Sequence, residues 1–182
     1  DVIVQNAGNS VEEQKRQLMY LLERDVDVIV VLPKDAESLV EEIEKIRAKN
    51  IPVISYDRLI LGTKVDLYVS VDSKQVGMLM GKKMQSIAGT RNWICILGPR
   101  EDFNMTLILN GISGSVKNHG RVISDVFYTE GWDYDFAKQK MVDVITSGKI
   151  PEAIICGNDA VCDAVISVLN SYYPDRHIPI CG

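Results

Sequence analysis

Polar and aromatic side chains that could recognise a small ligand follow several short apolar runs of this sequence. The candidates that we select are Asp57, Arg58, Asp102, Asn104, Trp132 and Asn158. The carboxylates accept hydrogen bonds, the guanidinium donates them, and the amides do both. A sugar ring needs this mixture, because its hydroxyls donate and accept and an indole face can cover its apolar C–H groups. The residue types therefore predict a monosaccharide-binding site.

Each candidate also has a purely structural interpretation, and the sequence leaves both interpretations open. Asp57 and Arg58 are adjacent and could form a surface ion pair. Asp102 and Asn104 could be first-turn helix residues that the helix dipole favours. Trp132 could belong to the core. Asn158 could cap the helix that follows it.

Short strand-like runs alternate with amphipathic stretches of about a dozen residues, which predicts parallel sheets flanked by helices. The expected strands are Val2–Gln5, Val26–Leu32, Pro52–Ser55, Tyr68–Val71, Trp93–Leu97, Arg121–Phe127, Ala153–Cys156 and Ile178–Cys181. The apolar run Val26–Leu32 predicts a strand buried on both faces. Ser10 and Asp72 each begin a capping box and predict helix starts.

The α/β pattern divides near residue 89, at the clearest flexible break between two β/α series. We therefore expect two Rossmann-like lobes, an N-terminal one over residues 1–89 and a C-terminal one over residues 90–182. The first lobe is expected to lack its first strand, and the second is expected to be truncated. In open α/β sheets ligands bind beyond the carboxyl ends of the strands, where all the candidate residues are expected to lie.

Composition and motifs argue against several other functions. The net charge is −5 and the chain has no block of Lys or Arg, so nucleic acid is not an expected partner. Its four cysteines, at positions 95, 156, 162 and 181, and its two histidines lack the spacing of a metal site. We expect the cysteines to act as small buried hydrophobes. No phosphate-binding glycine motif or nucleophile elbow is present, so we expect neither a cofactor nor an enzyme.

Three segments resemble the type I periplasmic sugar-binding proteins, and most of all their D-xylose-binding branch. They are Tyr56-Asp57-Arg58, the stretch from Val69 to Gly77, and Gly157-Asn158-Asp159-Ala160. The resemblance implies periplasmic-binding-protein type I lobes that close on one sugar. It implies that Asp57 and Arg58 contact the sugar from the first lobe, and Asp102 and Asn104 from the second. It also implies that Trp132 stacks on the ring and Asn158 bonds a hydroxyl.

The expected function is therefore non-catalytic, extracytoplasmic binding of a monosaccharide such as the pentose D-xylose. The membrane partner would be an ABC-type permease or a sensor histidine kinase, and any signal region is expected outside these residues. One alternative is the effector-binding core of a sugar-responsive transcription regulator. Another is an α/β enzyme that uses Asp57 or Asp102 as a base.

Overall fold

Helices and strands alternate along the chain in the computed structural model, which describes residues 1–89, 91–119 and 122–182. The elements are α1 (Val11–Leu22), β1 (Ile29–Val31), α2 (Val40–Ala48), β2 (Val53–Tyr56), β3 (Leu67–Val69), α3 (Ser73–Ala88), β4 (Trp93–Leu97), α4 (Phe103–Val116), η1 (Lys117–His119), β5 (Ile123–Tyr128), α5 (Tyr134–Thr146), β6 (Ala153–Cys156), α6 (Asp159–Tyr172) and β7 (Ile180–Cys181). All the strand pairs are parallel, which confirms the predicted α/β class.

The chain forms two units. The first unit comprises Asp1–Val71 and Glu101–Asn104, and the second comprises Asp72–Arg100 and Met105–Gly182. We predicted the division near residue 89, whereas the units separate between Val71 and Asp72. Thr90, where the predicted second lobe begins, lies outside the described residues.

The first unit contains a three-stranded sheet in the order β1-β2-β3. Leu18 of α1 and Ile43 of α2 pack with Ile29 of β1 and Val53 of β2 in one buried cluster. Val30 points away from this cluster and is 61% exposed. The prediction that the run at 26–32 is buried on both faces is therefore wrong, because α1 and α2 cover one face of the sheet and leave residues of alternate parity exposed.

The predicted strand over Val2–Gln5 is also absent. These residues carry no strand assignment, and Val2 and Val4 are 88% and 82% exposed. A strand needs a neighbour to satisfy its backbone N–H and C=O groups, and β-rich composition does not supply that neighbour.

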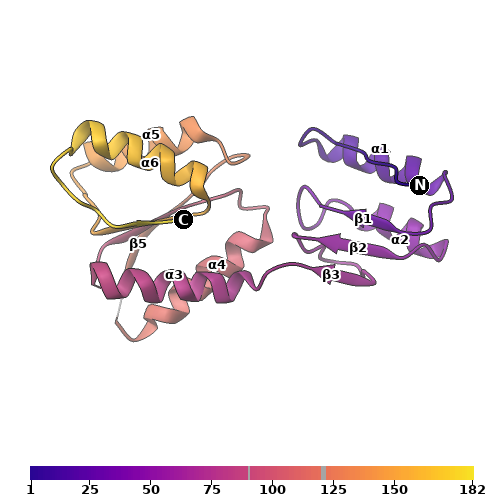
Figure 1. Ribbon diagram of the computed structural model, residues 1–182, viewed down its shortest axis with the longest axis horizontal. Coiled ribbons are helices and arrows are strands. Elements are labelled where there is room, and N and C mark those ends of the chain that lie inside the picture. The colour runs from indigo at the N-terminus through magenta and orange to yellow at the C-terminus, as the bar shows by residue number, and fades with distance from the viewer. Residues whose placement is uncertain (90, 120–121) are drawn as a thin grey trace. The chain divides into compact units, whose positions relative to one another are not determined.

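The second unit contains a four-stranded sheet in the order β5-β4-β6-β7, with α5 and α6 on one face and α3 and α4 on the other (Figure 1). The central strand β4 is buried throughout. Its side chains alternate between the faces as a pleated strand requires. Ile94 and Ile96 join the cluster with α5 and α6, whereas Trp93, Cys95 and Leu97 join the cluster with α3 and α4.

Glycines bring α3 and α4 into close contact. A Cβ atom added at Gly77 of α3 would lie 2.0 Å from the Ile108 carbonyl oxygen of α4. One added at Gly111 of α4 would lie 2.1 Å from the Lys74 carbonyl oxygen. The two backbones approach closely only because these side chains are missing, and this packing places α3 in the second unit.

Side-chain caps fix the starts of several helices. Ser10 accepts a hydrogen bond from the backbone amide of Glu13 and Asp72 accepts one from the backbone amide of Gln75, so both predicted helix starts are confirmed.

Within α3 the sequence predicts that Val76, Met80, Met84 and Ile87 face inward. Met84 is fully buried, but Val76 and Ile87 are 37% and 50% exposed. In the part of the chain that the structure describes, no helix combines the length and hydropathy needed to cross a membrane.

Candidate functional site

A tight turn at the carboxyl end of β2 presents the first two candidate residues. Asp57 has a φ of 62°, a left-handed conformation that an acidic residue tolerates better than most. The Arg58 amide donates to the Tyr56 carbonyl at 2.7 Å across this turn, and the Ser55 hydroxyl donates to the Arg58 carbonyl at 2.5 Å. The turn leaves the Asp57 side chain exposed and available to a ligand.

Three donors hold the backbone carbonyl of Asp57. They are the Tyr68 hydroxyl at 3.1 Å, the Ser70 hydroxyl at 2.7 Å and the Asn104 side-chain amide at 3.2 Å. Tyr68 lies in β3, and Ser70 is the first residue after this strand. The strand next to β2 therefore holds the turn in place. Asn104 is buried, and its amide therefore helps to orient Asp57 in addition to any contact with a ligand.

Arg58 and Asp102 form a partly buried ion pair in the first unit, in which the carboxylate is the buried member. The Arg58 Nε atom lies 2.8 Å from Asp102 Oδ2, and the two side chains are 22% and 5% exposed. Arg58 Nη1 also donates to the carbonyls of Pro33 and Lys34 at 3.3 and 3.5 Å. Asp102 Oδ1 accepts a hydrogen bond from the backbone N–H of Asn104 at 3.1 Å, as the side chain of an N-cap residue does. These bonds use Nε and Nη1 and leave the Nη2 donors for another acceptor.

Trp132 lies beyond the carboxyl ends of β4 and β6 in the second unit. It follows Gly131 in a turn where both residues have positive φ, 60° and 64°. A Cβ atom added at Gly98 would lie 2.3 Å from the indole, and one added at Gly157 would lie 3.0 Å from it. The ring is half-buried: its body packs on both clusters of the second unit, and part of it stays exposed. Trp132 can therefore belong to the core and still offer a surface to a ligand.

Asn158 caps α6. Its Oδ1 atom accepts the Val161 amide at 2.9 Å, as the structural interpretation expected. The cap uses only the oxygen, so the side-chain NH₂ group keeps its donors for a ligand hydroxyl. Asn158 directly follows Gly157, against which the Trp132 ring packs, so these two candidates lie at the same strand ends.

We expect variants of Asn158 to separate these two roles. Asn158→Ala removes the cap and should lower the free energy of unfolding by about 1 kcal/mol. Asn158→Asp keeps an acceptor for the Val161 amide but loses the NH₂ donor, so stability should hold while sugar affinity falls. Urea unfolding and calorimetric titration of both variants measure the two effects. Equal affinity of Asn158→Asp and the unsubstituted protein would contradict the ligand role.

Sequence reasoning did not select a cation–π pair at the same strand ends. The Arg100 guanidinium lies 4.0 Å from the centre of the Tyr128 ring, in cation–π contact. Arg100 is exposed just beyond β4, and Tyr128 ends β5. The available signal was position in the sequence: Arg100 lies in the loop between β4 and α4, two residues before Asp102, and Tyr128 closely precedes the Trp132 turn.

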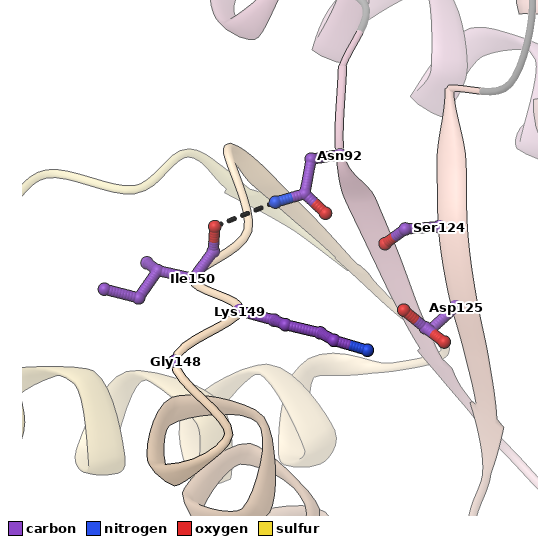
Figure 2. Close-up of a pocket in the computed structure, with 6 residues that line it drawn as sticks. All are labelled: Asn92, Ser124, Asp125, Gly148, Lys149 and Ile150. Atoms are coloured by element: carbon purple, nitrogen blue, oxygen red, sulfur yellow. Dashed lines mark hydrogen bonds between the residues drawn. The ribbon is translucent and has the colours of Figure 1, made fainter.

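An open hollow of about 520 Å³ lies at the opposite end of the second unit's sheet (Figure 2). Asn92, which directly precedes β4, donates to the Ile150 carbonyl at 2.8 Å on its wall. The Lys149 side chain extends toward Asp125, so the hollow carries both signs of charge (Figure 2). None of the residues that line this hollow is a predicted site residue.

The structure thus assembles the candidates as two sets, one in each unit. Asp57, Arg58, Asp102 and Asn104 interact directly in the first unit. We predicted that Asp102 and Asn104 act from the second lobe. The structure instead places the Glu101–Asn104 segment in the first unit. Trp132 and Asn158 form the second set. Contact of all six residues with one ligand stays a prediction.

Among the described residues, no group of three or more His, Cys, Asp or Glu side chains is placed to hold a metal ion. The side chains of the two sets can form hydrogen bonds and, through Trp132, an aromatic stack. Carboxylate and guanidinium groups bind neutral hydroxyls through charge-assisted bonds of about 1.5–3 kcal/mol each, and amide groups bind them through neutral bonds of about 0.5–1.5 kcal/mol.

Comparison with curated proteins identifies a relative along the whole chain. The D-xylose-binding periplasmic protein of Escherichia coli is 28% identical over 188 residues, which cover 100% of this chain and 56% of that protein. The protein of the same name from Haemophilus influenzae is also 28% identical. The chain therefore spans little more than half the length of these relatives.

Solved structures show the same fold. A solute-binding protein of an ABC transporter from Clostridium phytofermentans, with bound β-D-glucose, matches with a TM-score of 0.88 at 25% identity. The match covers 100% of this chain and 62% of that one. The fructose-binding periplasmic domain of a hybrid two-component system matches with a TM-score of 0.85 at 20% identity, covering 99% of this chain and 60% of that one.

The family described as "Periplasmic binding protein domain" matches residues 1–181. This match covers nearly the whole sequence, and it agrees with the parallel sheets flanked by helices and with the type I sugar-binding structures. The chain belongs to the periplasmic binding protein domain family.

Proposed function

We propose that this chain belongs to a non-catalytic, extracytoplasmic binding protein for a monosaccharide, with D-xylose as the first candidate. The observation that carries the proposal is the set formed by Asp57, Arg58, Asp102 and Asn104. It places an exposed carboxylate and free guanidinium donors at the carboxyl edge of a parallel sheet. That edge is where open α/β folds bind ligands. The D-xylose-binding names of the curated relatives support the choice of sugar.

In the proposed mechanism the two units act as the two lobes of the binding protein. The first unit supplies the Asp57 carboxylate and the Arg58 Nη2 donors, and the second supplies the Trp132 ring and the Asn158 amide. A sugar that contacts both sets binds the closed arrangement more tightly than the open one, and this difference in affinity shifts the population toward closure.

The partner in this proposal is an ABC-type permease that receives the sugar from the closed form. The glucose-bound relative from an ABC transporter supports this role. A sensor role, in which closure is read by a membrane histidine kinase, is the second candidate. The similarity to a fructose-binding domain of a hybrid two-component system favours it.

Calorimetric titration of the protein with xylose, ribose, glucose and arabinose tests the proposal. We expect saturable binding of at least one of these sugars, tightest for xylose, and recovery of the sugar unchanged after release. Absence of binding to all four would refute the proposal, and chemical conversion of the sugar would favour the enzyme alternative.

Trp132→Ala is expected to weaken sugar binding by about 1–3 kcal/mol if the exposed part of the indole stacks on the ring. It should also lower the melting temperature, because the body of the ring packs on both clusters of the second unit. Tyr172→Ala is the matched control, since Tyr172 is 50% exposed at the end of α6. A loss of melting temperature with affinity unchanged would assign Trp132 to the core alone.

A further inference from the structure

The benzene ring of the Trp132 indole rests on two glycines from neighbouring strand ends. Gly98 directly follows β4, and Gly157 directly follows β6. A Cβ atom added at Gly98 would lie 2.3 Å from both Cζ2 and Cη2 of the indole, and one added at Gly157 would lie 3.0 Å from its Cζ3. Non-bonded carbon atoms prefer a separation of about 3.5–4.0 Å. The indole therefore occupies space that a side chain at Gly98 would fill.

Space, and not backbone conformation, requires glycine at these two positions. Neither Gly98 nor Gly157 has a positive φ, so other residue types could adopt their backbone conformations. The Gly98 amide donates to the buried Met105 sulfur of α4 at 3.2 Å, and the Gly157 amide donates to the Ile96 carbonyl at 2.9 Å. These hydrogen bonds fix the floor on which the indole lies.

Trp132 itself holds an unfavourable backbone conformation. Its φ of 64° lies in the left-handed region, which bulky residues rarely adopt. Gly131 precedes it with a φ of 60°, and the Asp133 amide closes the turn onto the Glu130 carbonyl at 3.1 Å. Such a conformation persists only where the surrounding structure fixes it. The strained turn and the glycine floor are thus two separate observations that point to a fixed indole.

We propose that Gly98 is a positioning residue for sugar binding: with Gly157 it forms a floor that orders the Trp132 indole before the sugar arrives. Ordering a side chain on binding costs free energy and weakens affinity, and an indole that is already ordered avoids this loss. The effect on affinity rests on the proposed function. The order of the indole does not, and it is measured without any sugar.

The order of the indole in the sugar-free protein is the first measurement. Trp93 and Trp132 are the two tryptophans, so nuclear magnetic resonance of isotope-labelled protein shows two indole N–H signals, which the Trp132→Ala variant assigns. Trp93 is completely buried and is the reference for a rigid ring. We expect the order parameter of the Trp132 indole N–H to be close to that of Trp93. A Trp132 indole far more mobile than Trp93 would overturn the proposal.

Gly98→Ala is the variant that displaces the indole, because the three atoms nearest to the new Cβ all belong to the Trp132 ring. A tilt of the ring relieves the clash, so the far-ultraviolet circular dichroism should stay unchanged while the melting temperature falls. The Trp132 indole signal should shift and its order parameter should fall. Sugar affinity should decrease about tenfold, because the displaced ring loses much of its stacking contact.

The same substitution in a Trp132→Ala background separates positioning from general damage to the fold. With the indole absent, Gly98→Ala should leave the melting temperature unchanged and the affinity within about twofold. Gly114→Ala is the matched control in the same unit, since a Cβ atom there meets nothing within 4 Å, and it should leave the Trp132 signal and the affinity unchanged. Equal losses of melting temperature from Gly98→Ala in both backgrounds would overturn the proposal.

Failure of the proposed function gives a different result from failure of this inference. If the unsubstituted protein binds no sugar but Gly98→Ala mobilises the Trp132 indole, the proposed function is wrong and the positioning by Gly98 stands. If sugar binds but the Trp132 signal and order parameter are the same in Gly98→Ala as in the unsubstituted protein, the positioning role is wrong and the proposed function stands.

Discussion

Arg58→Ala is expected to destabilise the first unit by about 3–5 kcal/mol and to abolish detectable sugar binding. The substitution leaves the Asp102 carboxylate, which is 5% exposed, without its cationic partner. It also removes the donors to the Pro33 and Lys34 carbonyls. Hydrogen exchange of the β1 and β2 amides reports the stability of this unit, and calorimetric titration reports the affinity.

Arg47→Ala provides the matched control for this result. Arg47 pairs with Asp66 at 3.6 Å, but this pair is more exposed: Asp66 is 44% exposed against 5% for Asp102, and Arg47 is 34% exposed against 22% for Arg58. Solvent screens such pairs, so the control should cost about 0–1 kcal/mol. An Arg58→Ala variant as stable as the control would contradict a stabilising ion pair between Arg58 and Asp102.

Arg58→Lys separates the structural role of Arg58 from its role in binding. Lysine restores a positive charge near Asp102 but lacks the planar fork that binds paired acceptors. We expect part of the lost stability to return while sugar affinity stays low. If affinity returns together with stability, Arg58 acts on the ligand only through the fold.

Gly77→Ala is expected to destabilise the second unit by about 3 kcal/mol or more. The new Cβ atom would lie 2.0 Å from the Ile108 carbonyl oxygen and 2.7 Å from its carbonyl carbon. These are backbone atoms, so no side-chain rotation relieves the clash and α3 must move away from α4. Urea unfolding followed by far-ultraviolet circular dichroism measures the loss.

Gly114→Ala is the control for the helix-propensity effect of the same substitution. Gly114 lies in α4, and a Cβ atom there meets nothing within 4 Å. Alanine is the better helix former, so this variant should gain about 0.5–1 kcal/mol. Similar stabilities for the two variants would show that α3 and α4 do not depend on the close approach at Gly77.

Features set by neighbouring residues could be predicted from the sequence. The caps at Ser10 and Asp72 and the strands β4 and β6 follow from local patterns and are confirmed. The strand expected over Val2–Gln5 failed because its existence depends on a pairing partner that local composition does not specify. The exposed Val30 is a similar case, since burial of the second face requires elements that periodicity does not reveal.

The candidate site shows the same limit at longer range. The sequence offered Asp57 as the ion-pair partner of Arg58, whereas the structure pairs Arg58 with Asp102, 44 residues further along the chain. Only the fold brings these two side chains together. The Asn158 cap, by contrast, spans three residues and was recognisable from the sequence.

The positions of the two tryptophans determine what an optical experiment on this protein can detect. Trp93 is completely buried in β4, and Trp132 lies half-buried at the strand ends of the same unit. The sequence contains no further tryptophan. Intrinsic indole emission therefore originates entirely in the second unit, with Trp93 as a constant background and Trp132 as the responsive signal. Unfolding of the second unit should therefore shift the emission spectrum directly, because both indoles lie in it.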